Sequence, residues 1–132
     1  MISNYYHADL TIMPEAHGVA RRLYARSGLA PQDLQLAMLY DAFTPQVLRQ
    51  LEAFGFCARG EAKDFVRDGN IELGGRLPVN TNGGLIGEAY IHGMNNITEA
   101  VRQLRGSASN QVKNLTHALV SCGMAGAILS NA

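Results

Sequence analysis

The chain has 132 residues, of which 47% are hydrophobic and 17% are charged, a composition that can bury a core and is not that of a disordered tract. Its 11 Lys and Arg residues balance 11 Asp and Glu residues, which argues against broad nucleic-acid binding because such binding needs a concentrated positive field. The polar start lacks the apolar core of a secretory signal, and no apolar run is long enough to span a bilayer. We expect one cytoplasmic domain over residues 1–132.

Cysteine and histidine usage argues against a metal site. Cys57 and Cys122 are the two cysteines, whereas a cysteine-based zinc site needs four ligands at close spacing. His7, His17 and His117 show no spacing typical of metal ligands. A disulfide is not expected in a reducing compartment. We therefore expect neither a metal nor a disulfide.

The first half of the chain predicts a helix, a strand and a second helix. Pro14 suits the first turn of a helix that Gly28 ends, and apolar residues recur between them at helical spacing. The short apolar segment 34–40 predicts a buried strand. Thr44 is placed to cap a second amphipathic helix. A short helix or an exposed loop is expected near residues 61–66.

The second half predicts a turn, a long helix and two strands. Residues 79–84 read VNTNGG, and such a cluster of Asn and Gly favours turns and positive φ. A helix is expected over residues 86–104, and strands over 115–121 and 127–130 with the tight turn CGMAG between them. This alternation predicts an α/β domain with a mixed sheet covered by helices. The long helix is expected to bury Ala89, Met94, Ile97, Ala100, Val101 and Leu104.

Three segments with reactive side chains fall where a strand or a helix meets a turn. Tyr40 and Asp41 lie at the end of the first predicted strand, residues 80–92 lead into the long helix, and Cys122 follows a later strand. Ligands of open α/β sheets gather outside the strand ends, so these segments are candidates for a common site. Asp41 could act as a base, although an Asp just before a helix is more often a cap.

His92 is the strongest single candidate, and Cys122 is a second one. A histidine titrates near neutral pH, so it can move protons or donate to a developing oxyanion. Backbone N–H groups in a glycine turn can lower the pKa of a thiol such as Cys122 and make it a base or a nucleophile. Taken alone, each residue also fits a structural role: a histidine bonded to a carbonyl, and an inert buried cysteine.

Three stretches follow one another along almost the whole chain: LYDAFTPQVLRQLEAFGFC, GRLPVNTNGGLIGEAYIHGMNNITEAVRQLRG and ALVSCGMAGA. Together they resemble the carboxy-terminal domain of thiolases, with the closest likeness to the sterol-carrier-protein type and the related thiolase-like lipid-transfer enzymes. The resemblance implies that the chain is one half of an acyl-CoA acyltransferase, which forms or cleaves C–C bonds by Claisen chemistry. Its substrate would be an acyl-CoA thioester, and no separate cofactor is implied.

The resemblance also implies roles for individual residues. His92 falls at the family's active-site histidine, which activates the nucleophile or helps to form an oxyanion hole. Cys122 falls at the cysteine before a glycine-rich turn, which acts as acid and base. Residues 40–43 fall at an oxyanion motif. Contacts with the substrate are expected from Asn82, Gly83, Gly84, Gly93 and Gly123.

Two departures from the family pattern suggest a different reaction. Tyr40 replaces the Asn or His of the oxyanion motif, and AYIHGMN replaces the motif with Gly-His-Pro. This variant resembles the thiolase-like lipid-transfer branch, some of whose members are retro-aldolases for steroid side-chain CoA thioesters. Tyr40 and Tyr90 would then transfer protons, because a phenol hydroxyl can protonate or deprotonate an aldol oxygen. Alternatively, both tyrosines pack with satisfied hydroxyls.

The amino-terminal half that carries the acylated cysteine in this pseudo-duplicated family has no counterpart here. Covalent catalysis needs its nucleophile, so this chain is not expected to complete a thiolase cycle alone. We expect a hetero-complex with an amino-terminal half, or a homodimer formed through exposed apolar surface. An OB-fold and zinc-ribbon protein, common beside this branch, is a further candidate partner. The alternative to an enzyme subunit is a non-catalytic or truncated domain that acts in protein–protein association.

Overall fold

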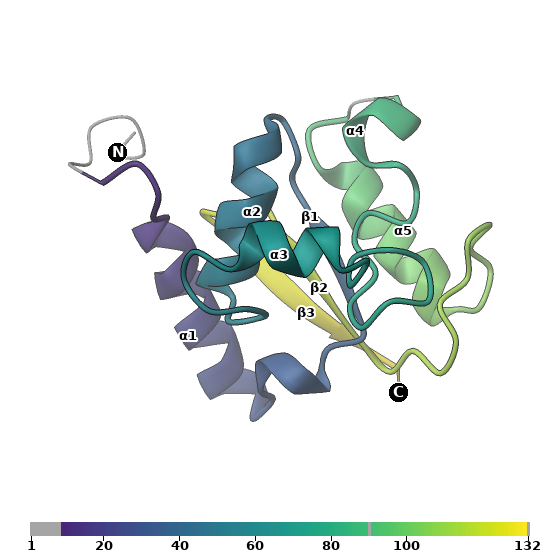
Figure 1. Cartoon of the computed structure of the whole chain (residues 1–132). Coiled ribbons are helices and arrows are strands. Elements are labelled where there is room, and N and C mark those ends of the chain that lie inside the picture. The colour runs from purple at the N-terminus through teal and green to yellow at the C-terminus, as the bar shows by residue number, and fades with distance from the viewer. Residues whose placement is uncertain (1–8, 90, 132) are drawn as a thin grey trace.

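The computed structural model describes residues 9–89 and 91–131, which form a small mixed sheet between two layers of helices (Figure 1). The three strands lie in the order β1-β2-β3, with β1 parallel to β2 and β2 antiparallel to β3. This arrangement confirms the predicted α/β class with a mixed sheet. The elements are α1 (Pro14–Ser27), a 3-10 turn (Pro31–Asp33), β1 (Leu36–Leu39), α2 (Thr44–Ala53), α3 (Ala62–Arg67), α4 (Gly84–Gly87), α5 (Met94–Leu104), β2 (His117–Ser121) and β3 (Gly126–Ser130).

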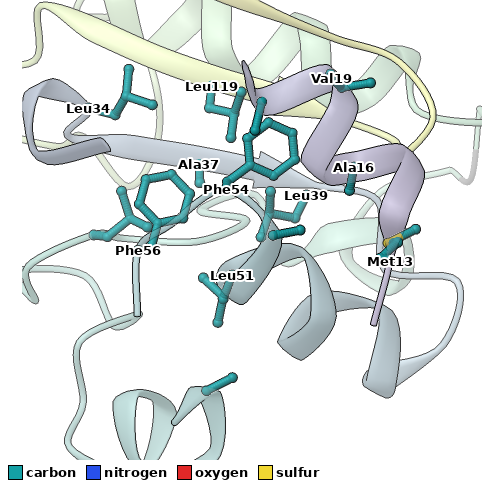
Figure 2. Packing of buried hydrophobic residues seen from close by; sticks show 14 of the residues in the cluster. Met13, Ala16, Val19, Leu34, Ala37, Leu39, Leu51, Phe54, Phe56 and Leu119 are labelled. Atoms are coloured by element: carbon teal, nitrogen blue, oxygen red, sulfur yellow. The ribbon is translucent and has the colours of Figure 1, made fainter. Parts of the chain in front are cut away.

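Both faces of β1 are covered, because all four of its residues are 0% exposed. Successive side chains of a strand point to opposite faces, so the strand serves two hydrophobic clusters. One cluster joins Leu36 and Met38 to Ala100 of α5. The other cluster packs the opposite face of the sheet against α1, α2 and α3 (Figure 2). It includes Ala37, Leu39, Leu119, Met13, Ala16, Val19, Leu51 and Phe54.

The side chain of Asn80 extends the pairing at the edge of β1 that β2 does not occupy. Val79 forms an isolated parallel bridge with Ala37. One step further, Asn80 Oδ1 accepts the N–H of Leu39 at 2.8 Å, and its Nδ2 donates to the carbonyl of Leu39 at 2.9 Å. The side-chain amide thus satisfies both backbone groups of Leu39 directly before Tyr40. Asn80 itself has φ 50°, which Asn tolerates better than most residues.

The helix predicted over residues 86–104 is divided in the structure. α4 ends at Gly87, and α5 begins at Met94. His92 and Gly93 between them have φ values of 43° and 90°. A right-handed helix cannot contain a pair of positive φ angles, so the chain turns here and α5 starts anew.

The prediction of which α5 residues are buried was also wrong in part. Ala100 is buried as predicted, but Met94 and Ile97 are exposed. In their place α5 buries polar side chains, among them Glu99 and Gln103. Glu99 accepts hydrogen bonds from Thr81 and Gln103, at 2.7 and 3.0 Å. Because these groups bond each other, a polar helix face can be buried at little cost.

The start of α2 differs from the prediction in one detail. Thr44 is the first helical residue, and Phe43 occupies the cap position with no side-chain cap hydrogen bond. A residue that already has helical geometry cannot serve as the N-cap, which explains why Thr44 does not cap the helix.

The part of the chain that the structure describes contains no helix long and apolar enough to cross a membrane.

Asn80→Ala is expected to lower the free energy of unfolding by about 2–3 kcal/mol, because two hydrogen bonds to buried backbone are lost and alanine disfavours positive φ. Urea unfolding followed by circular dichroism measures this loss. Asn114 offers a matched control, since it has a φ of 54° on the exposed surface. Asn114→Ala should cost only about 1 kcal/mol, for the backbone alone. Equal losses for the two variants would show that the amide does not support β1.

Candidate functional site

A pocket of about 350 Å³ lies at the ends of β1 and β2, between β3 and the start of α5. β1 and β2 are parallel, so their carboxyl ends meet at one edge of the sheet. The pocket is mainly apolar, with a few polar groups in its wall, as is typical of small-molecule sites. Its lining consists of Tyr40, His92, Gly93, Met94, Asn96, Ile97, Val120, Ser121, Cys122, Ala125, Gly126, Ala127 and Leu129.

Tyr40 is the first residue after β1, and its backbone is held from two sides. Its N–H donates to the carbonyl of Ser121 at 2.8 Å, which extends the pairing of β1 with β2. Its carbonyl accepts the side-chain amide of Gln50, from α2, at 3.0 Å. A Cβ at Gly93 would lie 3.7 Å from Cδ2 of Tyr40, so the tyrosine ring faces this glycine. The ring therefore has a defined place in the pocket wall.

His92 and Cys122 reach the same pocket from two different turns. His92 is exposed, and its positive φ turns the chain into α5. Cys122 is also exposed, and it begins the hairpin turn between β2 and β3. Its N–H donates to the carbonyl of Ala125 at 3.0 Å, and its Sγ lies 3.6 Å from the same oxygen. The structure thus brings Tyr40, His92 and Cys122 together, as the sequence led us to expect.

Asp41 holds the next segment of the site through a backbone contact, and it does not cap α2. Both of its carboxylate oxygens lie within 3.3 Å of the N–H of Leu85, which they accept. Gly84, just before it, has φ 66°, and a Cβ there would lie 2.0 Å from the carboxylate of Asp41. Only glycine fits this approach. The contact ties the end of β1 to the turn that leads toward His92.

Most of the predicted substrate contacts lie outside the pocket. Asn82 holds its own turn, because its side chain donates to Glu88 at 3.1 Å and accepts the N–H of Gly84 at 3.0 Å. Gly83 precedes α4, and Gly123 packs against Met13 on the other side of the hairpin turn. Of the five residues expected to bind substrate, Gly93 lines the pocket. Tyr90 lies outside the described residues.

Sequence reasoning missed the wall that α5 and β3 supply. Asn96, Ile97 and Leu129 all line the pocket. Because the helix prediction placed Ile97 in the core, its position at the pocket was not predicted. The pair Asn95-Asn96 directly after His92 and Gly93 was the signal that could have indicated a polar group there.

Cys57 lies apart from the pocket, near Glu52 and Glu61. Burial and the two neighbouring carboxylates raise the pKa of the Cys57 thiol to about 11. The thiol therefore stays protonated at neutral pH and is a poor nucleophile. Across residues 9–89 and 91–131, no three His, Cys, Asp or Glu side chains are grouped so that they could hold a metal ion.

Comparison with known families places the whole pocket in one domain. Residues 3–132 match the model of the family described as thiolase C-terminal domain-like. This chain belongs to that family. The match includes β1, β2, β3 and α5, and with them Tyr40, His92 and Cys122.

Two curated relatives and one solved structure are similar over nearly the whole chain. The chain is 59% identical to the steroid side-chain-cleaving aldolase of Thermomonospora curvata, over 93% of this chain and 32% of that protein. It is also 59% identical to the 17-hydroxy-3-oxo-4-pregnene-20-carboxyl-CoA lyase of Mycobacterium tuberculosis, over 91% of this chain and 31% of that protein. A structure of the Ltp2-ChsH2(DUF35) aldolase superposes with a TM-score of 0.91 at 57% identity, covering 96% of this chain and 34% of that chain.

The chain therefore spans about a third of the length of these curated relatives. The comparison covers this third of each relative.

Gly84→Ala is expected to destabilise the fold by about 3 kcal/mol, from the positive φ and from overlap with the Asp41 carboxylate. Gly28→Ala is the matched control: Gly28 has φ 71° and nothing near its Cβ position, so about 1 kcal/mol is expected from the backbone alone. Thermal unfolding measures both losses. The double variant Asp41→Ala/Gly84→Ala should lose less than the two single variants together. Strict additivity would mean that Asp41 does not contact this turn in solution.

Proposed function

We propose that this chain is the carboxy-terminal catalytic part of an aldolase that cleaves a C–C bond in a 3-hydroxyacyl-CoA thioester. The observation that carries the proposal is the position of Tyr40, in one apolar pocket with His92 and Cys122. The family resemblance expects Asn or His where Tyr40 stands, and a phenol supplies different proton chemistry. The high identity to two steroid side-chain enzymes supports aldol cleavage over the acyl transfer of ordinary thiolases.

The proposed reaction is a retro-aldol cleavage. A base removes the proton of the 3-hydroxyl, and the bond between C2 and C3 breaks as the 3-oxygen becomes a carbonyl. The electron pair of that bond moves onto the thioester as an enolate, which an acid then protonates at C2. The products are a ketone and a shorter acyl-CoA. Every atom and electron is accounted for without an oxidant or a reductant.

The residues of the pocket fit the parts of this reaction. Tyr40 would exchange a proton with the 3-oxygen or with C2, since general acid and base groups need only reach the atom they serve. His92 would donate to the thioester oxygen as the enolate forms. Cys122 would act as the second acid or base, a role that Tyr90 could share. The apolar lining suits a bulky hydrocarbon acyl part, such as a steroid side chain with its ring system.

The pocket requires a partner to close it. Exposed apolar side chains, Met94 and Ile97, form part of its lining. Apolar groups clustered at a site edge are typical of an interface. The chain covers about a third of its relatives' length, so the rest of such an enzyme would cover this face, in the same or another polypeptide. The two-component name of the related aldolase structure supports a hetero-complex.

The test combines this chain with a segment that corresponds to the remaining two thirds of its relatives. Cleavage is followed as the release of ketone and shortened acyl-CoA from a 3-hydroxyacyl-CoA. Tyr40→Phe should lower kcat/KM by about 10²–10⁴-fold, the usual effect of losing a general acid or base. The phenyl ring keeps the packing against Gly93, so the loss is assigned to the hydroxyl.

Tyr24→Phe is the matched control. The Tyr24 hydroxyl donates to the carbonyl of Phe54 at 2.7 Å, far from the pocket, so its removal affects stability and should leave cleavage unchanged. Full activity of the Tyr40→Phe assembly would contradict the assignment of Tyr40. Thiolytic acyl transfer without aldol cleavage, in the unmodified assembly, would contradict the proposed reaction itself.

A further inference from the structure

The side chain of Asn96 is a polar group in the pocket wall to which the mechanism above gives no role. Asn96 lies in the first turn of α5, is 1% exposed and lines the pocket. Neither its Nδ2 nor its Oδ1 has a hydrogen-bond partner. A buried amide without partners destabilises a fold, so its presence needs a reason.

The other polar groups of the pocket wall differ from Asn96 in this respect. Ser121 Oγ accepts the N–H of Gly123 at 2.9 Å, and Cys122 Sγ lies 3.6 Å from the carbonyl of Ala125. Tyr40 and His92 have interactions of their own. Among the described residues that line the pocket, Asn96 is thus the polar side chain whose donor and acceptor both remain available.

Two other buried polar side chains of α5, Glu99 and Gln103, are bonded within the chain. Gln103 donates to the carbonyl of Asn110 at 2.7 Å, and its Oε1 accepts the N–H of Val112 at 2.9 Å. Glu99 is bonded to Thr81 and Gln103. Asn96 is one turn away on the same helix and has no internal partner. Asn95 beside it is also unpartnered, but Asn96 lines the pocket, so a bound ligand can reach its amide.

We propose that Asn96 is a further catalytic residue, whose side-chain N–H donates to the 3-oxygen of the bound 3-hydroxyacyl-CoA. This inference rests on the proposed function. The 3-oxygen is a hydroxyl in the substrate, gains negative charge as its proton leaves, and is a carbonyl oxygen in the product. An amide donor can bond all three forms, and it bonds the charged form most strongly.

The position of Asn96 suits this role. A donor fixed on a helix costs no reorganisation when charge develops on the substrate. The apolar lining lowers the local dielectric, which strengthens each hydrogen bond inside the pocket. Met94 and Ile97 flank Asn96 on the helix and are largely exposed, so their side chains can turn outward as a ligand enters.

The experiment measures binding by calorimetry to the assembly of this chain with the segment corresponding to the rest of its relatives. Two probes are compared: an analogue of a 3-hydroxyacyl-CoA in which a methylene replaces the thioester carbonyl, and its 3-deoxy counterpart. Without the carbonyl no enolate can form, so neither probe is cleaved while it binds. The unmodified assembly should prefer the hydroxy compound by roughly tenfold or more, because the deoxy compound leaves the buried amide unpartnered. The Asn96→Leu assembly should bind both compounds alike. Its melting temperature should also rise, because an unpartnered amide is replaced by an apolar side chain of similar shape.

Asn95→Leu is the matched control. Asn95 is also buried with both amide atoms unpartnered, in the same helical turn, but it does not line the pocket. This variant should keep the preference for the hydroxy compound. If the unmodified assembly shows no preference, or if Asn96→Leu keeps it, the inference is overturned. A lower melting temperature of the Asn96→Leu assembly would overturn it too, because Asn96 would then serve a contact with the added segment.

Failure of the role proposed for Asn96 can be distinguished from failure of the proposed function. Aldol cleavage that depends on Tyr40, together with an unchanged hydroxyl preference in Asn96→Leu, contradicts the role of Asn96 alone. A hydroxyl preference that Asn96→Leu abolishes, in an assembly that does not cleave the thioester, contradicts the proposed reaction. Where the leucine variant does not fold, Asn96→Ala, which also lacks the amide donor, takes its place in the same comparison.

Discussion

The hydrogen bonds between the Asn80 amide and both backbone groups of Leu39 are the constraint on which the site depends. They complete the free edge of β1 at its last residue, where β2 pairs on the other side through Ser121. The chain therefore leaves the sheet at a defined point, and Tyr40 follows immediately. One residue later, Asp41 holds Leu85 and the turn beyond it. The end of the sheet that lines the pocket is thus positioned by side chains that bond backbone.

The division of the predicted long helix is the second element of this arrangement. The positive φ angles at His92 and Gly93 turn the chain, so that α5 begins beside the ends of the strands. α5 then buries a largely polar face, in which Glu99 and Gln103 bond other side chains and fix the rotation of the helix relative to the sheet. As a result Met94 and Ile97 lie at the mouth of the pocket and Asn96 lies in its wall. The same rotation leaves apolar surface exposed where further protein is expected to pack.

Much of this architecture could be predicted from the sequence, because local signals were strong. Pro14 and Gly28 mark α1, and the apolar segment before Tyr40 marks β1, which the structure shortens to Leu36–Leu39. The grouping of Tyr40, His92 and Cys122 followed from their places after strands and turns. The face of α5 could not be predicted, because hydrophobic periodicity does not reveal polar residues that bond each other. The roles of Asn80 and Asp41 depend on contacts between residues more than 40 positions apart, which no local pattern encodes.

The most direct test of the account is reconstitution of activity. This chain, a segment corresponding to the other two thirds of its relatives, and their mixture are each assayed for cleavage of a 3-hydroxyacyl-CoA, with mass in solution followed by light scattering. The account predicts a defined hetero-complex and cleavage by the mixture alone. A homodimer of this chain that ignores the added segment and binds no CoA thioester would contradict it, and would favour a domain that acts in association without catalysis.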